Sequence, residues 1–197
     1  MKIINRLLPL FALASLSACV VPTGPVEVTR FNRVADGIVY GTGTYSVELA
    51  GDAAAGQDLA ASPYIASVAR EMQRVGYIDK VGGGSDVTAE VRFGVMTVKA
   101  DRRSPVSVGV GGSTGSYGSG VGLGVGINLG GGGTQVETTL AVRIVRRVDN
   151  LVIWEGKAVQ AAKAGSPAAQ PGIAASKLAT ALFQDFPGVS GETIRVP

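Results

Sequence analysis

Alternation of apolar and polar residues is the clearest pattern in the chain and predicts β-strands. Between residues 87 and 95 the apolar residues occupy every second position, and the same holds between residues 136 and 144. The first set is Val87, Ala89, Val91, Phe93 and Val95, and the second is Val136, Thr138, Leu140, Val142 and Ile144. This period of two is typical of a sheet with one buried and one wetter face. Asp149-Asn150 predicts a tight turn into a further strand over residues 151–162.

Two weaker strands are expected nearer the N-terminus, over residues 26–34 and 37–49, with Asp36-Gly37 between them. A helix is predicted to start at Ser62-Pro63, an N-cap followed by a first-turn proline, and to end at Gly76. Its apolar stripe is Ile65, Val68, Ala69 and Met72, so that Arg70, Glu71, Gln73 and Arg74 are expected in solvent.

A second helix is predicted from Pro171 to a point before Pro187, with Ala174, Leu178, Ala181 and Leu182 on its buried side. The order of elements is therefore β-β-α-β-β-β-α. It favours an α+β two-layer sandwich, in which a largely antiparallel sheet carries two helices on one face.

A glycine-rich segment, residues 105–132, interrupts the long β-hairpin. One interpretation is a flexible linker. The other is a ribbon extending the hairpin, because apolar residues alternate with glycine there. The candidate interaction residues in it are Val121, Leu123, Val125, Ile127 and Leu129. An apolar ribbon would suit a partner, a second copy of the chain or a bilayer. Its glycines do not form a dinucleotide site, since the expected context is a pair of strands and not a βαβ unit.

The N-terminus carries Lys2 and Arg6, then an apolar run over residues 7–16 that is too short for a bilayer-spanning helix. A secretory signal fits this pattern. The run ends in "LSAC", which resembles the bacterial lipobox, with signal cleavage between Ala18 and Cys19. The resemblance implies a diacylglycerol on the Cys19 thiol and an acyl chain on its new amino group. By the same resemblance, Val20 directly after the cysteine implies sorting to the outer membrane, facing the periplasm, with the inner membrane as the alternative.

These signals divide the chain into a signal peptide (1–18), a lipidated tether (19–25) and one periplasmic α+β domain (26–197). Removing residues 1–18 takes two of the 18 basic residues and none of the 15 acidic ones, leaving 16 and 15. A balance so close to neutral gives no electrostatic case for nucleic acid.

Candidate chemistry is sparse. The chain has no histidine, and its single cysteine is Cys19, so the commonest general base and the commonest metal ligands are missing. We therefore expect no enzyme, no metal site and no cofactor besides the covalent lipid. Arg143, Arg146 and Arg147 form a small basic cluster that could meet lipid phosphate or an anionic glycan, although a solvated surface is the simpler interpretation. Trp154 is expected in the core, and Asp79, Asp86 and Glu90 on a solvated rim or capping turns.

Several short motifs carry a family resemblance. They are Gly76-Tyr77 after the first helix, Asp86 before the next strand, Trp154 with Gly156, and Phe186-Pro187 after the last helix. Over about residues 26–190 the chain resembles the bacterial lipoprotein family known as domain of unknown function 4136. The family usually has a clearer "Y-x-T-Y/F-x-W" element near its N-terminus, of which Tyr45 is a candidate remnant. The resemblance implies a fold and a cellular location but no catalytic activity.

The function expected from the sequence is that of a lipid-anchored periplasmic envelope lipoprotein, a non-catalytic binding or structural module for an envelope protein or glycan. The alternative is a lipoprotein that assembles through its glycine-rich hairpin, as a homo-oligomer or a membrane-inserting pore.

Overall fold

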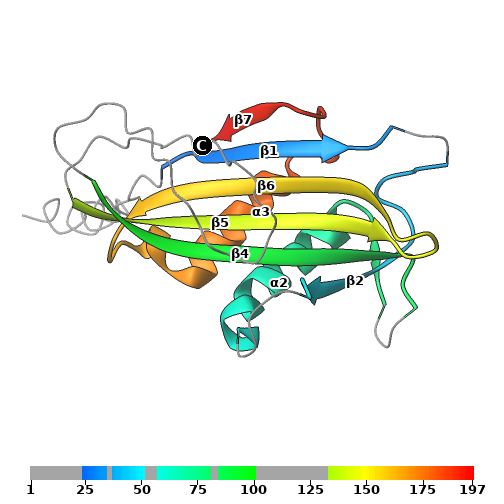
Figure 1. Ribbon diagram of the computed structural model, residues 1–197, viewed down its shortest axis with the longest axis horizontal. Helices are drawn as coiled ribbons and strands as arrows, with labels where there is room; N and C mark the ends of the chain where they lie inside the picture. The colour runs from blue at the N-terminus through cyan, green and yellow to red at the C-terminus, as the bar shows by residue number, and fades with distance from the viewer. Residues whose placement is uncertain (1–23, 35–36, 52–56, 81–83, 101–132) are drawn as a thin grey trace, which may run out of the picture.

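The described part of the chain folds into a seven-stranded, mostly antiparallel sheet with two helices packed on one of its faces (Figure 1). The computed structural model describes residues 24–34, 37–51, 57–80, 84–100 and 133–197. The sheet has the strand order β3-β2-β4-β5-β6-β1-β7. Its strands are β1 (Val26–Asn32), β2 (Thr44–Leu49), β3 (Ile78–Asp79), β4 (Val87–Ala100), β5 (Gly133–Arg146), β6 (Leu151–Lys163) and β7 (Thr193–Val196). The predicted α+β sandwich is confirmed.

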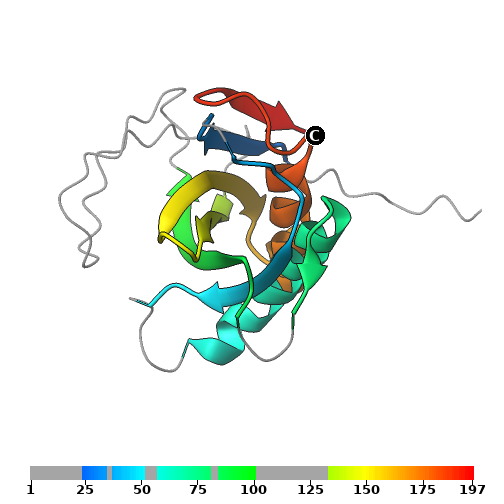
Figure 2. The same ribbon diagram turned by 90° about the vertical axis from the view of Figure 1, so that its right-hand side faces the viewer.

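The centre of the sheet is formed by β4, β5 and β6, which are long neighbours joined antiparallel. Their alternation places Val91, Val142 and Leu140 on the buried face, as predicted. The turn at Asp149-Asn150 is also where the sequence places it, and Asn150 adopts a left-handed backbone with φ of 57°. Seen along the strands, the sheet curves round the helices, so that its other face is convex (Figure 2). We call this convex face the outer face.

The hairpin extends beyond the helices, which the alternation did not indicate. Val87 and Ala89 are buried, but Phe93 is only half-buried and Val95 is exposed. Tyr64 of α2 (Asp58–Arg74) stacks on Phe93 of β4, with ring centroids 4.6 Å apart. Alternation identifies the face of a strand but not how far the covering helix reaches.

The two N-terminal strands do not pair with each other. Strand β1 lies between β6 and β7, whereas β2 lies on the opposite side of the sheet, parallel to β4. The chain passes from β2 through α2 to β4, which is a crossover connection of the kind that parallel neighbours require. Two short strands, β3 and β7, were not expected. Their few residues carry too little alternation to be recognised, and both lie at edges of the sheet.

Helix α2 begins at Asp58, four residues before the predicted start. Asp58 supplies a negative charge to the first turn, where the helix dipole favours it. Pro63 therefore lies inside the helix and removes a hydrogen bond to Leu59, whose side chain is exposed. Because Leu59 is in the first turn, water can replace that bond, and the helix tolerates the proline.

The buried face of α2 is rotated relative to the predicted stripe. Val68 and Met72 are buried as expected, whereas Ile65 and Ala69 are only half-buried. The prediction that Glu71 is in solvent is wrong. The residue is 9% exposed, and its carboxylate accepts hydrogen bonds from Arg74 Nε at 2.5 Å and from Thr180 Oγ1 at 2.8 Å. Burial of this charge is possible because both partners compensate it.

The second helix, α3 (Pro171–Phe183), starts and ends as predicted. A short 3-10 turn, η2 (Pro167–Ala169), precedes it. Arg74 Nη2 donates to the carbonyl of Phe183 at 2.9 Å, so the end of α2 satisfies one of the free carbonyls at the end of α3. This bond and the Thr180–Glu71 bond fix the two helices to each other.

Candidate functional site

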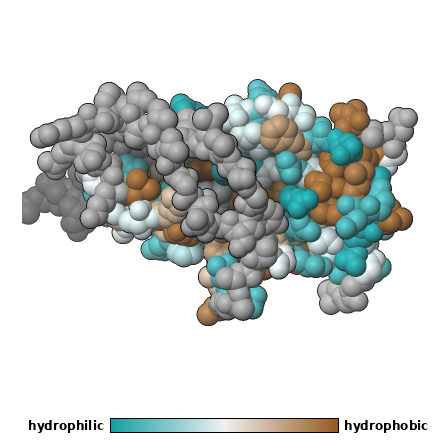
Figure 3. All heavy atoms as spheres, in the orientation of Figure 1, coloured by the Kyte–Doolittle hydropathy of each residue, from teal (hydrophilic) through white to brown (hydrophobic). Residues whose placement is uncertain are grey.

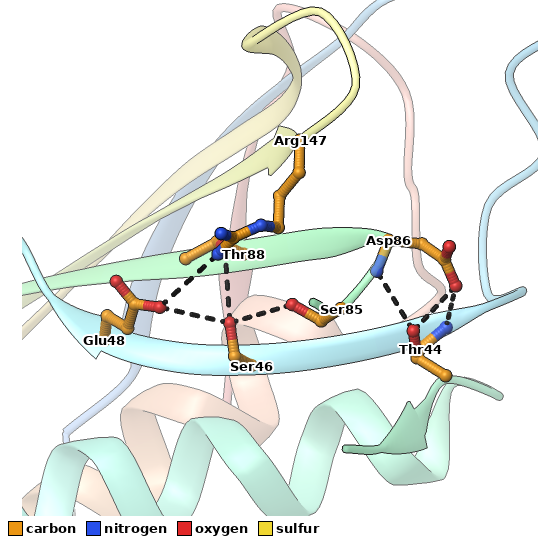
Figure 4. Close-up of polar contacts among 7 residues, drawn as sticks. All are labelled: Thr44, Ser46, Glu48, Ser85, Asp86, Thr88 and Arg147. Atoms are coloured by element: carbon orange, nitrogen blue, oxygen red, sulfur yellow. Dashed lines mark hydrogen bonds and ion pairs between the residues drawn. The ribbon is translucent and has the colours of Figure 1, made fainter. Parts of the chain in front are cut away.

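A network of polar side chains occupies the outer face where β2 and β4 begin (Figure 4). We call it the strand-end network. Its members are Thr44, Ser46, Glu48, Ser85, Asp86, Thr88 and Arg147. Because β2 and β4 run in parallel with Ser46 opposite Thr88 and Glu48 opposite Glu90, polar residues at alternate positions fall side by side on one face.

Asp86 fastens the start of β2 to the start of β4. Its Oδ2 accepts hydrogen bonds from the backbone N–H and from Oγ1 of Thr44, both at 2.7 Å. These two bonds from Thr44 and the nearby charge of Lys80 hold the pKa of Asp86 below its usual value. Asp86 therefore has the capping role that was one of the two expectations for it.

The hydroxyl of Ser46 lies at the centre of the network. It accepts from Ser85 Oγ at 3.0 Å, lies 3.2 Å from Thr88 Oγ1 and donates to Glu48 Oε1 at 3.3 Å. Ser85 and Thr88 are themselves buried. These bonds form a chain from Ser85 through Ser46 to Glu48. Ser85, the serine at the end of the chain, is buried, so a substrate would have no access to its hydroxyl as a nucleophile, and the arrangement suits a structural role.

The three arginines of the predicted basic cluster are separated by the fold. Arg147 Nη1 lies 3.8 Å from Glu48 and donates to Thr88 at 3.2 Å, while Arg143 Nη1 lies 3.4 Å from Glu90. Both are on the outer face. Arg146 instead binds Asp149 in the β5–β6 turn, at 3.0 and 2.6 Å. This bidentate pair lowers the pKa of Asp149 and raises that of Arg146. Since each guanidinium faces a carboxylate, the three do not form one cationic patch.

A shallow hollow of about 410 Å³ adjoins the network on the outer face. Phe31, which is 49% exposed, and Val152 are among the apolar residues that line it. Arg33 and Glu155 flank it, and Glu155 stands opposite Phe31 in the sheet. The register links the hollow to the network, because Thr88 pairs with Val145 and Val145 with Val152. Hydrophilic and apolar residues are interleaved at the right-hand end of this face (Figure 3).

Sequence reasoning missed the hollow and most of the strand-end network. The alternation of Thr44, Ser46 and Glu48 was the available signal for the β2 side. The hollow had no such signal, because it depends on β1 pairing with β6 across 122 or more residues of chain, as in Phe31 with Glu155. Other expected site residues lie outside the described residues and are not placed: Ala18, Cys19, Val121, Leu123, Val125, Ile127 and Leu129.

Apart from Asp86, the motif residues that carry the family resemblance come together in the core and not in the strand-end network. Trp154 packs on Phe183 and Phe186, with ring centroids 5.3 Å away in each case, and Tyr77 lies 6.4 Å from Phe186. The indole Nε1 donates to the carbonyl of Pro187 at 3.0 Å. Tyr40 completes this aromatic cluster at 5.7 Å from Phe186. Trp154 is buried, as predicted.

Both motif glycines are required by close approaches. Gly76 follows α2 with φ of 109°, and a Cβ there would lie 2.5 Å from the carbonyl oxygen of Gly41. At Gly156 a Cβ would lie 2.7 Å from the Trp154 ring and 2.8 Å from Leu182. The Trp-x-Gly motif therefore lets the indole lie flat over the strand.

Among the described residues, none of the helices combines the length and the apolar character needed to cross a membrane. Across those same residues, no three His, Cys, Asp or Glu side chains gather as a metal-binding group.

The family model described as "Domain of unknown function (DUF4136)" matches residues 28–188. The chain belongs to this family. The resemblance identified from the motifs is thereby confirmed, and the family's description assigns no activity.

The matches to individual proteins are partial or of low sequence identity. A segment of 62 residues is 47% identical to an uncharacterised protein of Zymomonas mobilis, covering 32% of this chain and 23% of that protein. The chain thus matches less than a quarter of that relative's length. Among solved structures, a PDZ domain protein from Parabacteroides distasonis aligns with a TM-score of 0.49 and 12% identity, over 97% of this chain and 42% of that one. PelC from Paraburkholderia phytofirmans, solved as a dodecamer, aligns with a TM-score of 0.37 and 10% identity, over 81% of this chain and 93% of that one.

Proposed function

We propose that the protein is a lipid-anchored envelope lipoprotein of the periplasmic side of the outer membrane, and that it binds another envelope protein without catalysing a reaction. The anchor rests on the "LSAC" sequence, in which Cys19 receives the lipid. Several acyl chains on one residue would hold the protein firmly, since a single chain binds only marginally. Cys19 is followed within seven residues by the first strand, so the tether is short.

The hollow on the outer face is the observation that carries the binding role. A half-exposed phenylalanine flanked by an arginine and a carboxylate has the composition of a protein interface, where aromatic residues and arginine are enriched. A glycan site would call for an exposed aromatic platform such as tryptophan. Trp154 is the single tryptophan of the chain and is buried, so a protein partner is favoured over a glycan.

The position of the hollow also suits a partner away from the anchor. Strand β1 starts at Val26, opposite Gln160 of β6, whereas the hollow is at Val152 of β6. Eight residues of strand separate the two positions, which corresponds to about 26 Å. The hollow thus lies toward the opposite end of the sheet from the point where the tether enters.

A non-catalytic role is supported by the side chains available. The chain contains no histidine, the hydroxyl of Ser85 is buried, and the carboxylates of Glu48 and Glu90 face arginines. These pairings neutralise charge and order the outer face, which serves recognition better than proton transfer.

Site-specific photocrosslinking in intact cells tests this function. A photoreactive amino acid at Val152 should give a discrete crosslinked species, and the additional change Phe31→Ala should weaken it about tenfold or more, as expected for a central aromatic contact. The matched control is the same photoreactive residue at Arg70, which is exposed on α2, away from the outer face. Equal crosslinking from both positions would contradict the assignment of the hollow.

The anchor is tested separately. Replacing Cys19 by Ser should release the protein into the soluble periplasmic fraction or leave it unprocessed. Maturation of this variant with unchanged retention in the outer membrane would overturn the anchor.

A further inference from the structure

The entry point of the chain into the domain is fixed beside α3. Lys177 Nζ donates a hydrogen bond to the carbonyl of Gly24 at 2.9 Å, and Val26 then pairs with Val196 of β7. Cys19 lies five residues before Gly24, and five residues span at most about 17 Å whatever their conformation. A lipid on Cys19 therefore keeps this part of the surface within about 17 Å of the acylated residue.

Exposed apolar side chains gather at the same end of the sheet. One row of paired residues runs from Val26 through Gln160 and Thr138 to Val95. Strand β4 continues past this row, where Met96 is 59% exposed and Val98 is exposed as well. Figure 1 shows the far end of β4, the start of β1 and the end of β7 together in the left-hand half of the view.

A groove of about 480 Å³ between α3 and β7 belongs to this end too. Ile173, 43% exposed, and Val196 give it an apolar lining, and Lys177 stands at its rim. Burial lowers the pKa of Lys177 from its usual value. Lys163 is exposed at the end of β6, in the same row as Val98.

We propose that this end of the domain rests on the phospholipid headgroups of the membrane that holds Cys19. We call it the anchor-side surface and define it by Val95, Met96, Val98, Lys163, Ile173 and Lys177. The inference rests on the proposed lipid anchor and adds an orientation to it: the strands stand on end, with the hollow facing away from the bilayer. Apolar side chains flanked by lysines are the composition that binds the interfacial layer, where the lysine stems lie along apolar surface and their ammonium groups reach phosphate.

Two features of the structure favour a lipid surface as the occupant. The short tether makes the contact intramolecular, so that a weak affinity is sufficient to populate it. The charges fit as well, because the exposed Lys163 and the half-buried Lys177 both belong to this surface, and lysine suits anionic headgroups.

Depth-dependent quenching in vesicles tests the orientation. The full mature lipoprotein would be incorporated into vesicles of phosphatidylethanolamine and phosphatidylglycerol, with single cysteines introduced for a fluorescent label. The acylated Cys19 does not react with the label. The variants Met96→Cys and Ile173→Cys probe the anchor-side surface, and Val148→Cys and Val189→Cys, whose parent side chains are 87% and 67% exposed, are the controls elsewhere on the surface. Nitroxide lipid should quench labels at Met96 and Ile173 several-fold more than those at Val148 and Val189.

A charge test adds a second readout. Lys163→Glu should lower quenching at position 96, by at least about fivefold in the contact equilibrium, because it removes one cation near an anionic surface and adds an anion. Lys157→Glu makes the same change on the same face of the same strand, about 20 Å away along it, and should have little effect.

The outcomes separate this proposal from the anchor. Mass spectrometry showing a mature Cys19 without acyl groups would overturn both. An acylated protein with equal quenching at all four positions would overturn the orientation alone. A label at Ile173 that becomes shielded with rising protein concentration, without quenching by nitroxide lipid, would assign the groove to a second copy of the chain and also overturn the orientation.

Discussion

The tightest contact in the family's Trp-x-Gly motif predicts the effect of adding one methyl group. In Gly156→Ala the new Cβ would lie 2.7 Å from Trp154 Cη2 and 2.8 Å from Leu182 Cδ1. Ordinary contacts are about 3.5–4.0 Å, so each neighbour has to move by roughly 1 Å. Both neighbours are fully buried, and Trp154 is held by Phe183, Phe186 and the carbonyl of Pro187. Overpacking of this kind costs about 1–3 kcal/mol.

Gly94→Ala is the matched control. Gly94 also lies within a central strand, but a Cβ there would meet no described atom within 4 Å. Because glycine destabilises a strand interior relative to alanine by roughly 0.5–1 kcal/mol, this change should be neutral or stabilising. The free energy of unfolding should therefore fall in Gly156→Ala and stay the same or rise in Gly94→Ala, relative to the parent protein.

Thermal unfolding followed by far-UV circular dichroism measures the difference. For a domain of this size 1 kcal/mol shifts Tm by about 2–4 °C, so Gly156→Ala should lower Tm by about 2–12 °C. Fluorescence of the single tryptophan provides a second probe of the same transition. A Gly156→Ala protein with the Tm of the parent would refute the reasoning, since it would mean that the indole moves aside without loss of packing.

Three further predictions concern the rest of the fold. In Asp86→Asn, the free energy of unfolding at neutral pH should fall and should depend less on pH. Hydrogen bonds from Thr44 lower the pKa of Asp86, so the stabilisation by this carboxylate is present above pH 3.8 and is lost as the pH falls through the lower folded-state pKa. Urea titrations at a series of pH values measure this. Thr180→Val removes the hydroxyl that donates to the buried Glu71 carboxylate and should cost about 1.5–3 kcal/mol in urea unfolding, whereas Thr193→Val, at the exposed Thr29 pair, should cost less than 1 kcal/mol. Deleting residues 105–132 and joining β4 to β5 by a short turn should leave a cooperatively folding domain, because the core cluster among the described residues already joins the sheet to both helices; loss of the cooperative transition would assign the segment to the core.

The elements that could be read from the sequence are those with long, regular patterns. Strands β4, β5 and β6 and helix α3 were predicted because their periodicity repeats over many residues and turn or proline signals bound them. Helix α2 was predicted to start too late, because Ser62-Pro63 is a strong local start signal. Its true start at Asp58 has only a weak one, an acid in the first turn. The start of the helix thus follows tertiary packing, in which Ala61 and Tyr64 are buried, and not the local start signal.

Pairing between distant segments could not be predicted. The sequence of residues 26–32 alone does not indicate that β1 pairs with β6 and β7 instead of with β2. The burial of Glu71 has the same origin, since its partner Thr180 lies 109 residues away along the chain. The candidate site depends on these pairings throughout: Thr44 meets Asp86, Glu48 meets Arg147 and Phe31 meets Glu155 only in the folded sheet.

The positions of the motif residues explain why the family gives a fold without an activity. Tyr77, Trp154 and Phe186 pack together under the sheet, Gly76 and Gly156 permit close approach, and Asp86 holds the start of β2. Each of these tasks serves the architecture. The residues proposed to recognise a partner or a membrane, Phe31 on the outer face and those of the anchor-side surface, do not belong to a motif. Variants at Phe31 and at Lys163 therefore test function, whereas variants of the motif residues would test folding.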